Sequence, residues 1–237
     1  QSSSVRKTWA TLAVMNARST CRGSTSGFGL SGECPGLDMR STVVLQAPTP
    51  REAGNPMLTD FARDHAFTIA WFGLMAFVWF GWGQEDPPAR WRGWLGAGSV
   101  LGLVFAGGFG VAVAKLWSDG TALDGAYWSF GLVVLLEVLA AGVGCLVLWR
   151  RRQARWMAWW VALIVALHLI PLALYFDDWA LAVLGVVQLA GLLLLVPRFR
   201  KNSEPTSRLV GPLMGTSFLV FSAVSASLFV AQRGLSW

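Results

Sequence analysis

The sequence predicts an all-α integral membrane protein, a six-transmembrane-helix bundle, and three observations support this fold class. First, six long apolar runs lie at about residues 66–82, 94–116, 127–149, 156–175, 179–197 and 210–231. Second, only 14% of the 237 residues are charged, against roughly 25% in soluble domains. Third, the connections between the runs are short. Because a helix satisfies its own backbone hydrogen bonds where water is absent, each run predicts a helix that crosses a bilayer.

Tryptophans mark the ends of most of these runs. The indole ring prefers the headgroup level of a membrane, so a tryptophan near a run end supports that boundary. Eight tryptophans lie at or near the ends of the first five runs: Trp82, Trp91, Trp94, Trp117, Trp128, Trp149, Trp156 and Trp179. The sixth run has no such marker and is predicted from its length and apolar composition. The even spread of these rings favours membrane anchors over an aromatic ligand site.

Residues 1–56 differ in composition from the rest of the chain. They are rich in Ser, Thr, Gly, Pro and Arg and show no sustained helical or strand periodicity, which is typical of a disordered segment. The chain starts with Gln1, whereas Met57 opens a short polar segment directly before the first run. We therefore expect a membrane domain at residues 57–237, a native product that starts at Met57, and a disordered leading segment outside that product.

The basic residues predict an orientation. Ten of the thirteen Lys and Arg residues after Met57 lie in the connections that follow the first, third and fifth runs. The other two connections carry the acidic residues Asp119, Asp124, Asp177 and Asp178, with Lys115 as the nearby cation. Because cytoplasmic loops collect Lys and Arg, both termini should lie outside the cell. The expected location is the plasma membrane, as a multi-pass protein.

Small residues recur at every fourth position of the second run, at Gly98, Gly102, Ala106 and Gly110. This spacing places them along one stripe of a helix, where backbones can approach closely and gain van der Waals contact. We expect the stripe to pack against another helix of the same bundle. A homo-oligomer interface is the alternative.

Three polar side chains lie inside apolar runs: Glu137 in the third, His168 in the fourth and Gln188 in the fifth. A central acidic side chain costs about 2.5 to 3.5 kcal/mol on insertion scales, so such residues usually face the bundle interior and find partners. Counted from the outer span ends at 1.5 Å per residue, Glu137 and His168 lie within roughly 5 Å of each other in depth. A contact between them is therefore geometrically allowed.

These residues support two interpretations. Glu137 and His168 could share a proton near neutral pH, as a proton-coupled carrier requires, with Gln188 as a polar contact to substrate. Pro171, three residues after His168, removes a backbone hydrogen bond and is a candidate hinge. Alternatively, a neutral Glu137 is hydrogen-bonded to Gln188 or His168 and links helices, which contributes about 0.6 to 2 kcal/mol.

The expected function is that of a small permease or proton-coupled carrier. The first alternative is a non-catalytic membrane sensor, scaffold or partner subunit, in which Glu137 only links helices. The second is an intramembrane enzyme, which normally needs a nucleophile with its base, paired acids or metal ligands. The chain has two histidines and no such constellation, so no enzymatic activity is expected.

No cofactor, metal or nucleic acid is expected as a ligand. The formal charge of +6 resides in short loops and not in a cluster on a water-facing surface, and the three cysteines show no CxxC spacing. Asp64 and His65 could form an exposed cation site with Asp177 and Asp178, although solvated loop carboxylates are commoner. The expected partners are the lipid bilayer, a small-molecule or proton substrate and a second copy of the chain.

Overall fold

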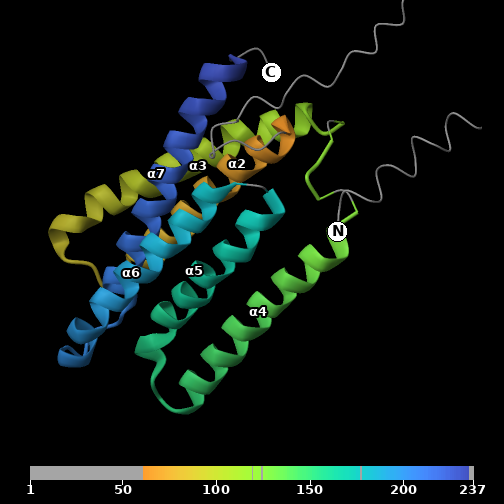
Figure 1. Cartoon of the computed structure of the whole chain (residues 1–237). Coiled ribbons are helices and arrows are strands. Elements are labelled where there is room, and N and C mark those ends of the chain that lie inside the picture. Colours follow the sequence, from red (N-terminus) through yellow and green to blue (C-terminus); the bar gives the residue numbers. More distant parts are fainter. Residues whose placement is uncertain (1–60, 119, 124, 177, 235–237) are drawn as a thin grey trace, which may run out of the picture. The chain divides into compact units, whose positions relative to one another are not determined.

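Six long helices make up the computed structural model of the chain, which describes residues 61–118, 120–123, 125–176 and 178–234 (Figure 1). They are α2 (Ala62–Trp82), α3 (Arg92–Lys115), α4 (Tyr127–Arg150), α5 (Met157–Phe176), α6 (Trp179–Lys201) and α7 (Ser207–Arg233). Two short 3-10 turns, η1 (Ala89–Trp91) and η2 (Ala154–Trp156), precede α3 and α5. The six long helices are long and apolar enough to cross a membrane, and the described residues form no strand. The prediction of an all-helical chain with six such helices is confirmed.

The helices are longer than some of the predicted runs. α2 begins at Ala62 and not near residue 66, and α6 continues through Pro197 to Lys201. Hydropathy reports where side chains become polar, whereas a helix can continue beyond that point with polar residues in its last turns. Residues 1–56 and the proposed start at Met57 lie outside the described residues.

The helices pack in two groups. α2 packs against α3 and α7 in the first group, and α5 packs against α4 and α6 in the second. α7 also contacts α5 and α6, so it joins the two groups. The larger apolar core lies among α2, α5, α6 and α7, and a smaller one lies among α2, α3 and α7. None of the residues of α4 is fully buried, and its principal helix contact is with α5.

α2 and α3 meet backbone to backbone at two glycines. A Cβ at Gly73 would lie 2.8 Å from the carbonyl oxygen of Gly102, and a Cβ at Gly102 would lie 2.6 Å from the carbonyl oxygen of Gly73. Such distances are far below ordinary van der Waals contact, so both positions require glycine. The close approach brings the two backbones into direct contact.

The small-residue stripe of α3 follows α2 for only part of its length. A Cβ at Gly98 would meet the ring of the buried Phe80, and the backbone nitrogen of Ala106 lies 3.0 Å from the Cβ position of Gly73. Gly102 lies between them in the same contact. Gly110 is exposed, and a Cβ added there would meet no atom within 4 Å among the described residues. The stripe therefore contacts α2 at Gly98, Gly102 and Ala106 and leaves it before Gly110.

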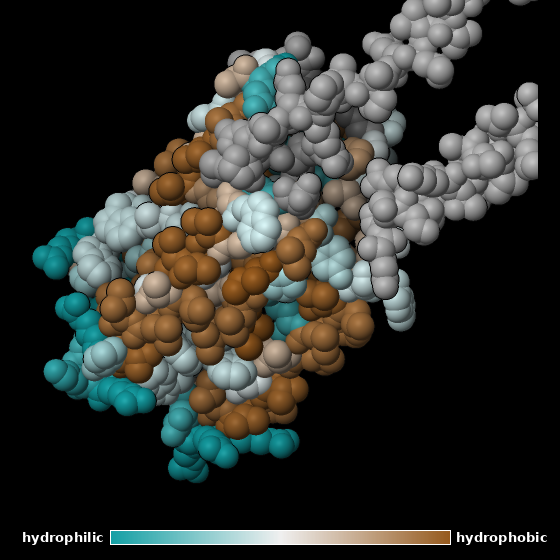
Figure 2. Space-filling view, in the orientation of Figure 1, coloured by the Kyte–Doolittle hydropathy of each residue, from teal (hydrophilic) through white to brown (hydrophobic). Residues whose placement is uncertain are grey.

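Hydrogen bonds join the three basic connections at one end of the helices. The carbonyl oxygen of Arg155 accepts from Thr206 N at 3.0 Å and from Thr206 Oγ1 at 2.7 Å, and Arg155 Nη1 donates to the carbonyl oxygen of Asn202 at 2.6 Å. Ser207 Oγ donates to Glu85 Oε2 at 2.6 Å. The connections after α2, α4 and α6 are thus held together. On the face that Figure 2 shows, hydrophilic residues gather at this end, and apolar side chains cover much of the surface between the helix ends.

Candidate functional site

Glu137 and His168 face each other across the contact between α4 and α5. Glu137 Oε2 lies 3.5 Å from His168 Nε2, and the two side chains are 22% and 11% exposed. Apolar residues surround them on both helices, because each interrupts a run of aliphatic side chains. The structure therefore places an acid and a base at contact distance in a largely apolar environment.

Trp160 of α5 holds the two helices in register near this pair. Its Nε1 donates to the carbonyl oxygen of Ala140 on α4 at 3.0 Å, and its indole lies against Gly144, where a Cβ would overlap the ring. Ala140 follows Glu137 by one turn, so the hydrogen bond fixes α4 directly beside the acid. The glycine is required for the indole to reach that carbonyl.

A cavity of about 250 Å³, here called the inner cavity, adjoins the acid and base. It lies among α2, α4, α5, α6 and α7, and all but three of its lining residues are apolar. Its lining residues are Phe67, Thr68, Trp71, Phe72, Met75, Phe130, Val134, Glu137, Val165, His168, Leu169, Leu172, Phe176, Leu181 and Phe218. Glu137 and His168 are the titratable members of this set. A ligand in the cavity would therefore meet one acid, one base and many aromatic rings.

A second cavity of about 280 Å³, here called the outer cavity, lies next to the connection between α3 and α4. It is lined by Arg63, Asp64, Phe67, Val113, Trp117, Thr121, Leu123, Tyr127, Phe130 and Phe176. Phe67, Phe130 and Phe176 line both cavities. The two cavities therefore adjoin at three phenylalanine side chains, which come from three different helices.

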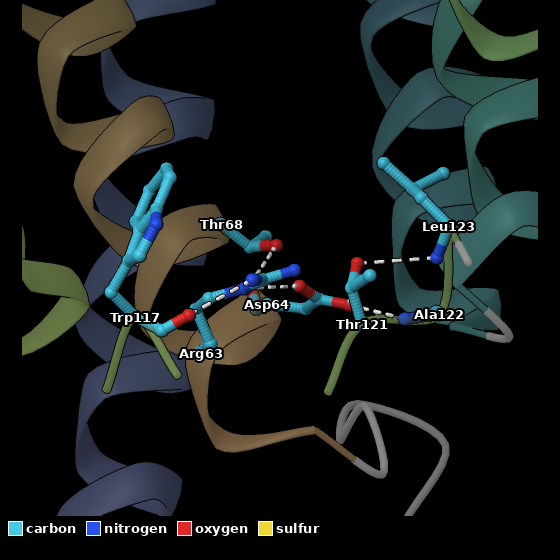
Figure 3. Close-up of polar contacts among 7 residues, drawn as sticks. All are labelled: Arg63, Asp64, Thr68, Trp117, Thr121, Ala122 and Leu123. Atoms are coloured by element: carbon cyan, nitrogen blue, oxygen red, sulfur yellow. Dashed lines mark hydrogen bonds and ion pairs between the residues drawn. The ribbon is translucent and has the colours of Figure 1, made fainter. Parts of the chain in front are cut away.

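Asp64 ties the connection between α3 and α4 to the start of α2 (Figure 3). Its Oδ2 accepts hydrogen bonds from Ala122 N at 2.7 Å and from Thr121 Oγ1 at 3.1 Å, and its Oδ1 lies 3.5 Å from Arg63 Nε. Arg63 Nη1 also donates to the carbonyl oxygen of Trp117 at 3.2 Å. These contacts hold the connection beside the outer cavity and pair the two charges that line it.

Gln188 does not line the inner cavity. Its side chain is fully buried on α6, and its Nε2 donates to Ser217 Oγ of α7 at 2.8 Å. Its Oε1 meets no hydrogen-bond donor in the described part of the chain. Ser217 in turn borders an apolar groove of about 750 Å³ between α6 and α7. The expected cluster of Glu137, His168 and Gln188 is therefore only a pair, because Gln188 faces a different helix.

Pro171 lies inside α5, which continues without interruption from Met157 to Phe176. It follows His168 by three residues, so the carbonyl group of residue 167 on the preceding turn has no backbone N–H of residue 171 to accept from. The structure shows one conformation of this helix. The role of Pro171 as a hinge stays a prediction.

Asp64, His65 and Asp178 do not form an exposed cation site. All three side chains are buried, with relative exposures of 5%, 1% and 1%. His65 Nε2 lies 3.1 Å from Ser225 Oγ on α7, whereas Asp64 binds the connection between α3 and α4. No three His, Cys, Asp or Glu side chains gather as metal ligands within the described ranges, and Asp177 lies outside them. The carboxylates of Asp64 and Asp178 accept hydrogen bonds from backbone N–H groups of the chain and are not solvated.

Asp178 caps the start of α6. Its Oδ1 accepts from Ala180 N at 2.9 Å. Burial raises the pKa of this carboxyl from 3.8 to about 6, and the hydrogen bond from Ala180 offsets part of that increase. A capping aspartate is therefore held in a site that disfavours its charge.

Six helices that are long and apolar enough to cross a membrane are typical of the class of multi-pass membrane proteins. The chain matches no protein-family model, and comparison with curated proteins and with solved structures also finds no match. The geometry of the chain is therefore the basis for a functional proposal.

Sequence reasoning identified Glu137 and His168 but missed Phe67, Trp71 and the outer cavity. Phe67 and Trp71 lie four residues apart, so they share one face of α2. This spacing of two aromatic residues is the signal that could have identified them as part of the cavity wall.

Proposed function

We propose that the chain is a small proton-coupled carrier, in which Glu137 and His168 bind the proton. The observation that carries this proposal is the 3.5 Å contact between Glu137 Oε2 and His168 Nε2 on the wall of the inner cavity. An acid and a base at this separation can pass a proton between them or hold one jointly. The cavity beside them provides room for a substrate whose binding changes where the proton resides.

The cavity also favours this proposal over a pair that only links two helices. Placing a carboxyl group in the membrane interior costs free energy. A pair that only links two helices gains no stability from an adjoining cavity of about 250 Å³. Trp160 already links α4 to α5 through its hydrogen bond to Ala140. The helix contact therefore has a second anchor next to the acid and base.

The proposed orientation follows the charges. The hydrogen-bonded end that carries the basic connections would face the cytoplasm of a cell whose plasma membrane holds the protein, and both termini would lie outside. The outer cavity, beside the connection between α3 and α4, would then face the exterior. Substrate would reach the inner cavity past Phe67, Phe130 and Phe176, which line both cavities.

Reconstituted vesicles test this function. The full chain is placed in liposomes that contain a pH-sensitive dye, a pH gradient is imposed, and ions, amines, sugars and drugs are added one at a time. We expect at least one class of compound to change the internal pH with the unmodified protein. Glu137→Gln should abolish that change, whereas Glu204→Gln should not, because Glu204 is exposed and pairs with Arg208 outside the cavities.

Two results would contradict the proposal. One is an unchanged flux in a folded Glu137→Gln protein. The other is no flux with any compound together with unfolding of Glu137→Ala, rescue by Glu137→Gln and copurification of a second protein. The latter result would favour the non-catalytic alternative, a sensor, scaffold or partner subunit in which Glu137 links helices.

A further inference from the structure

The inner cavity combines several aromatic rings with one carboxylate and no basic guanidinium or ammonium group among its described lining residues. The rings belong to Phe67, Trp71, Phe72, Phe130, Phe176 and Phe218. The face of an aromatic ring carries partial negative charge and attracts cations. Both features of the lining therefore favour a positively charged ligand over an anion.

Phe67 and Trp71 are the rings that the protein itself covers least. Each is 45% exposed, and they stack at a centroid distance of 6.0 Å with an interplanar angle of 13°. Phe72, in contrast, is 3% exposed and packs against Phe218 and Phe221 at 5.2 and 5.1 Å. Phe72 therefore belongs to the core, whereas Phe67 and Trp71 have surface left for a ligand.

Polar ligands with several hydroxyl groups fit the lining poorly. Apart from Glu137 and His168, the polar lining residue is Thr68, and its Oγ1 already donates to the carbonyl oxygen of Asp64 at 2.8 Å. A sugar would leave most of its hydroxyl groups without partners in an apolar site, at a penalty of about 1 to 3 kcal/mol each. The ligand should instead have one charge and an apolar body.

We infer that the inner cavity binds a small lipophilic organic cation, a quaternary or protonated amine, with its charge at Glu137 and its apolar body against Phe67 and Trp71. This inference rests on the proposed carrier function and names its substrate class. A cavity of about 250 Å³ holds about ten to fifteen non-hydrogen atoms at the packing density of a protein interior. A single aromatic ring that bears a trimethylammonium group is of this size.

The charges predict how proton and substrate are exchanged. From the five helices that line the inner cavity, Glu137 and His168 are the titratable groups among the described lining residues. Arg63 and Asp64, which line the adjoining outer cavity, lie 3.5 Å apart and largely cancel each other. One carboxylate can interact fully with a bound monovalent cation or with a proton shared with His168, but not with both. Binding of one cation should therefore release one proton, and the exchange should be electroneutral.

The first experiment measures binding to the full chain in lipid nanodiscs. The probes are phenyltrimethylammonium, benzenesulfonate and acetanilide, a cation, an anion and a neutral compound of about ten non-hydrogen atoms each, which matches the cavity. We expect the cation alone to bind, with release of one proton measured by calorimetry in buffers of different ionisation enthalpy. Its charge is permanent, so any released proton comes from the protein.

Four variants locate the site. Glu137→Gln should weaken binding of phenyltrimethylammonium by about tenfold or more, and Glu137→Asp should retain part of the affinity. Trp71→Leu, which keeps an apolar side chain but removes the ring, should weaken binding by about fivefold. Trp128→Leu is the matched control, because Trp128 is 87% exposed on α4 and lines neither cavity. Melting temperatures of all four proteins report whether each variant is folded.

The outcomes separate the substrate class from the carrier function. Equal binding of the anion or the neutral compound, or an unchanged affinity in folded Glu137→Gln, would overturn the inference. Binding of phenyltrimethylammonium without uptake into vesicles under a pH gradient would support the ligand class and count against the carrier. Proton-driven flux of other compounds, with no binding of the cation, would support the carrier and overturn the ligand class.

Discussion

Replacing Gly102 with alanine should weaken the contact between α2 and α3. The new Cβ would lie 2.6 Å from the carbonyl oxygen of Gly73 and 2.9 Å from the backbone nitrogen of Phe77. Ordinary contacts of a Cβ begin at 3.4 Å, and both opposing atoms are backbone, so neither can rotate away as the end of a side chain could. The two helices must separate by about 0.5 to 1 Å to accept the methyl group.

The expected loss is about 1 to 3 kcal/mol in the free energy of unfolding. Overpacking that forces backbone shifts typically costs about 1 to 3 kcal/mol and occasionally more. The higher helix propensity of alanine offsets up to about 1 kcal/mol of this loss in stability. Gly110→Ala is the matched control in the same helix, because Gly110 is exposed and its added Cβ meets no described atom within 4 Å. That variant should be neutral or up to about 1 kcal/mol more stable.

The assay is unfolding by increasing SDS in mixed micelles, followed by far-ultraviolet circular dichroism and by tryptophan fluorescence. Gly102→Ala should unfold at a lower SDS fraction than the unmodified protein, and Gly110→Ala at an equal or higher one. The reasoning would be refuted if both variants shifted alike, or if Gly102→Ala matched the unmodified protein. Either result would mean that the glycine contact does not stabilise the pairing of α2 with α3.

Three further predictions concern buried polar contacts at the two ends. Between pH 3.8 and about 6 the folded state holds the Asp178 proton more tightly than the unfolded state, so stability should fall as pH rises through this window. Asp178→Asn, which keeps an acceptor for Ala180 N–H, should remove this dependence and raise stability at pH 7 by about 1 to 3 kcal/mol, measured from melting curves. Asp64→Asn should weaken the charge-assisted bond to Ala122 by about 1 kcal/mol and speed hydrogen exchange of that amide; unchanged exchange would show that the loop is held by other contacts. Thr206→Val should lower stability by about 1 to 3 kcal/mol, because the carbonyl of Arg155 loses one of its two donors and Trp159 N–H loses its acceptor, whereas Thr206→Ser should behave like the unmodified protein.

The number of helices and the position of the polar residues along each helix could be predicted from the sequence, but the direction in which each side chain faces could not. Glu137 and His168 come within 3.5 Å, which counting along the two spans allowed. Gln188 lies at a similar depth, yet its side chain faces Ser217 on α7. The position of a residue along a helix can be counted from the sequence. The direction of its side chain depends on how the helix is rotated against its neighbours. The mostly apolar sequence of α6 does not indicate which of its faces packs against protein.

Contacts between segments far apart in the chain also could not be predicted from the sequence. Asp64 is buried because the connection after α3 folds over the start of α2 and donates Ala122 N–H to it. The residue itself looks like an ordinary acidic residue before a membrane span. Gly110 illustrates the same limit, since its spacing continues the stripe of Gly98 and Gly102 although α3 has already left α2 at that point. Crossing angle decides where a stripe ends, and the spacing of small residues does not contain it.

The weak attachment of α4 has a consequence for how the inner cavity communicates with its surroundings. α4 supplies Phe130, Val134 and Glu137 to the cavity wall but has no fully buried residue, and it packs chiefly on α5. Tilting α4 away from α2 therefore exposes less apolar surface than separating any better buried pair of helices, and in a bilayer the exposed surface meets acyl chains at little cost. A sideways route to the inner cavity, through the hydrocarbon, would therefore exist beside the proposed one past Phe67, Phe130 and Phe176. For a ligand that follows this path, the concentration that matters is the one dissolved in the lipid, so apparent affinities measured against aqueous concentration should follow the ligand's partition coefficient.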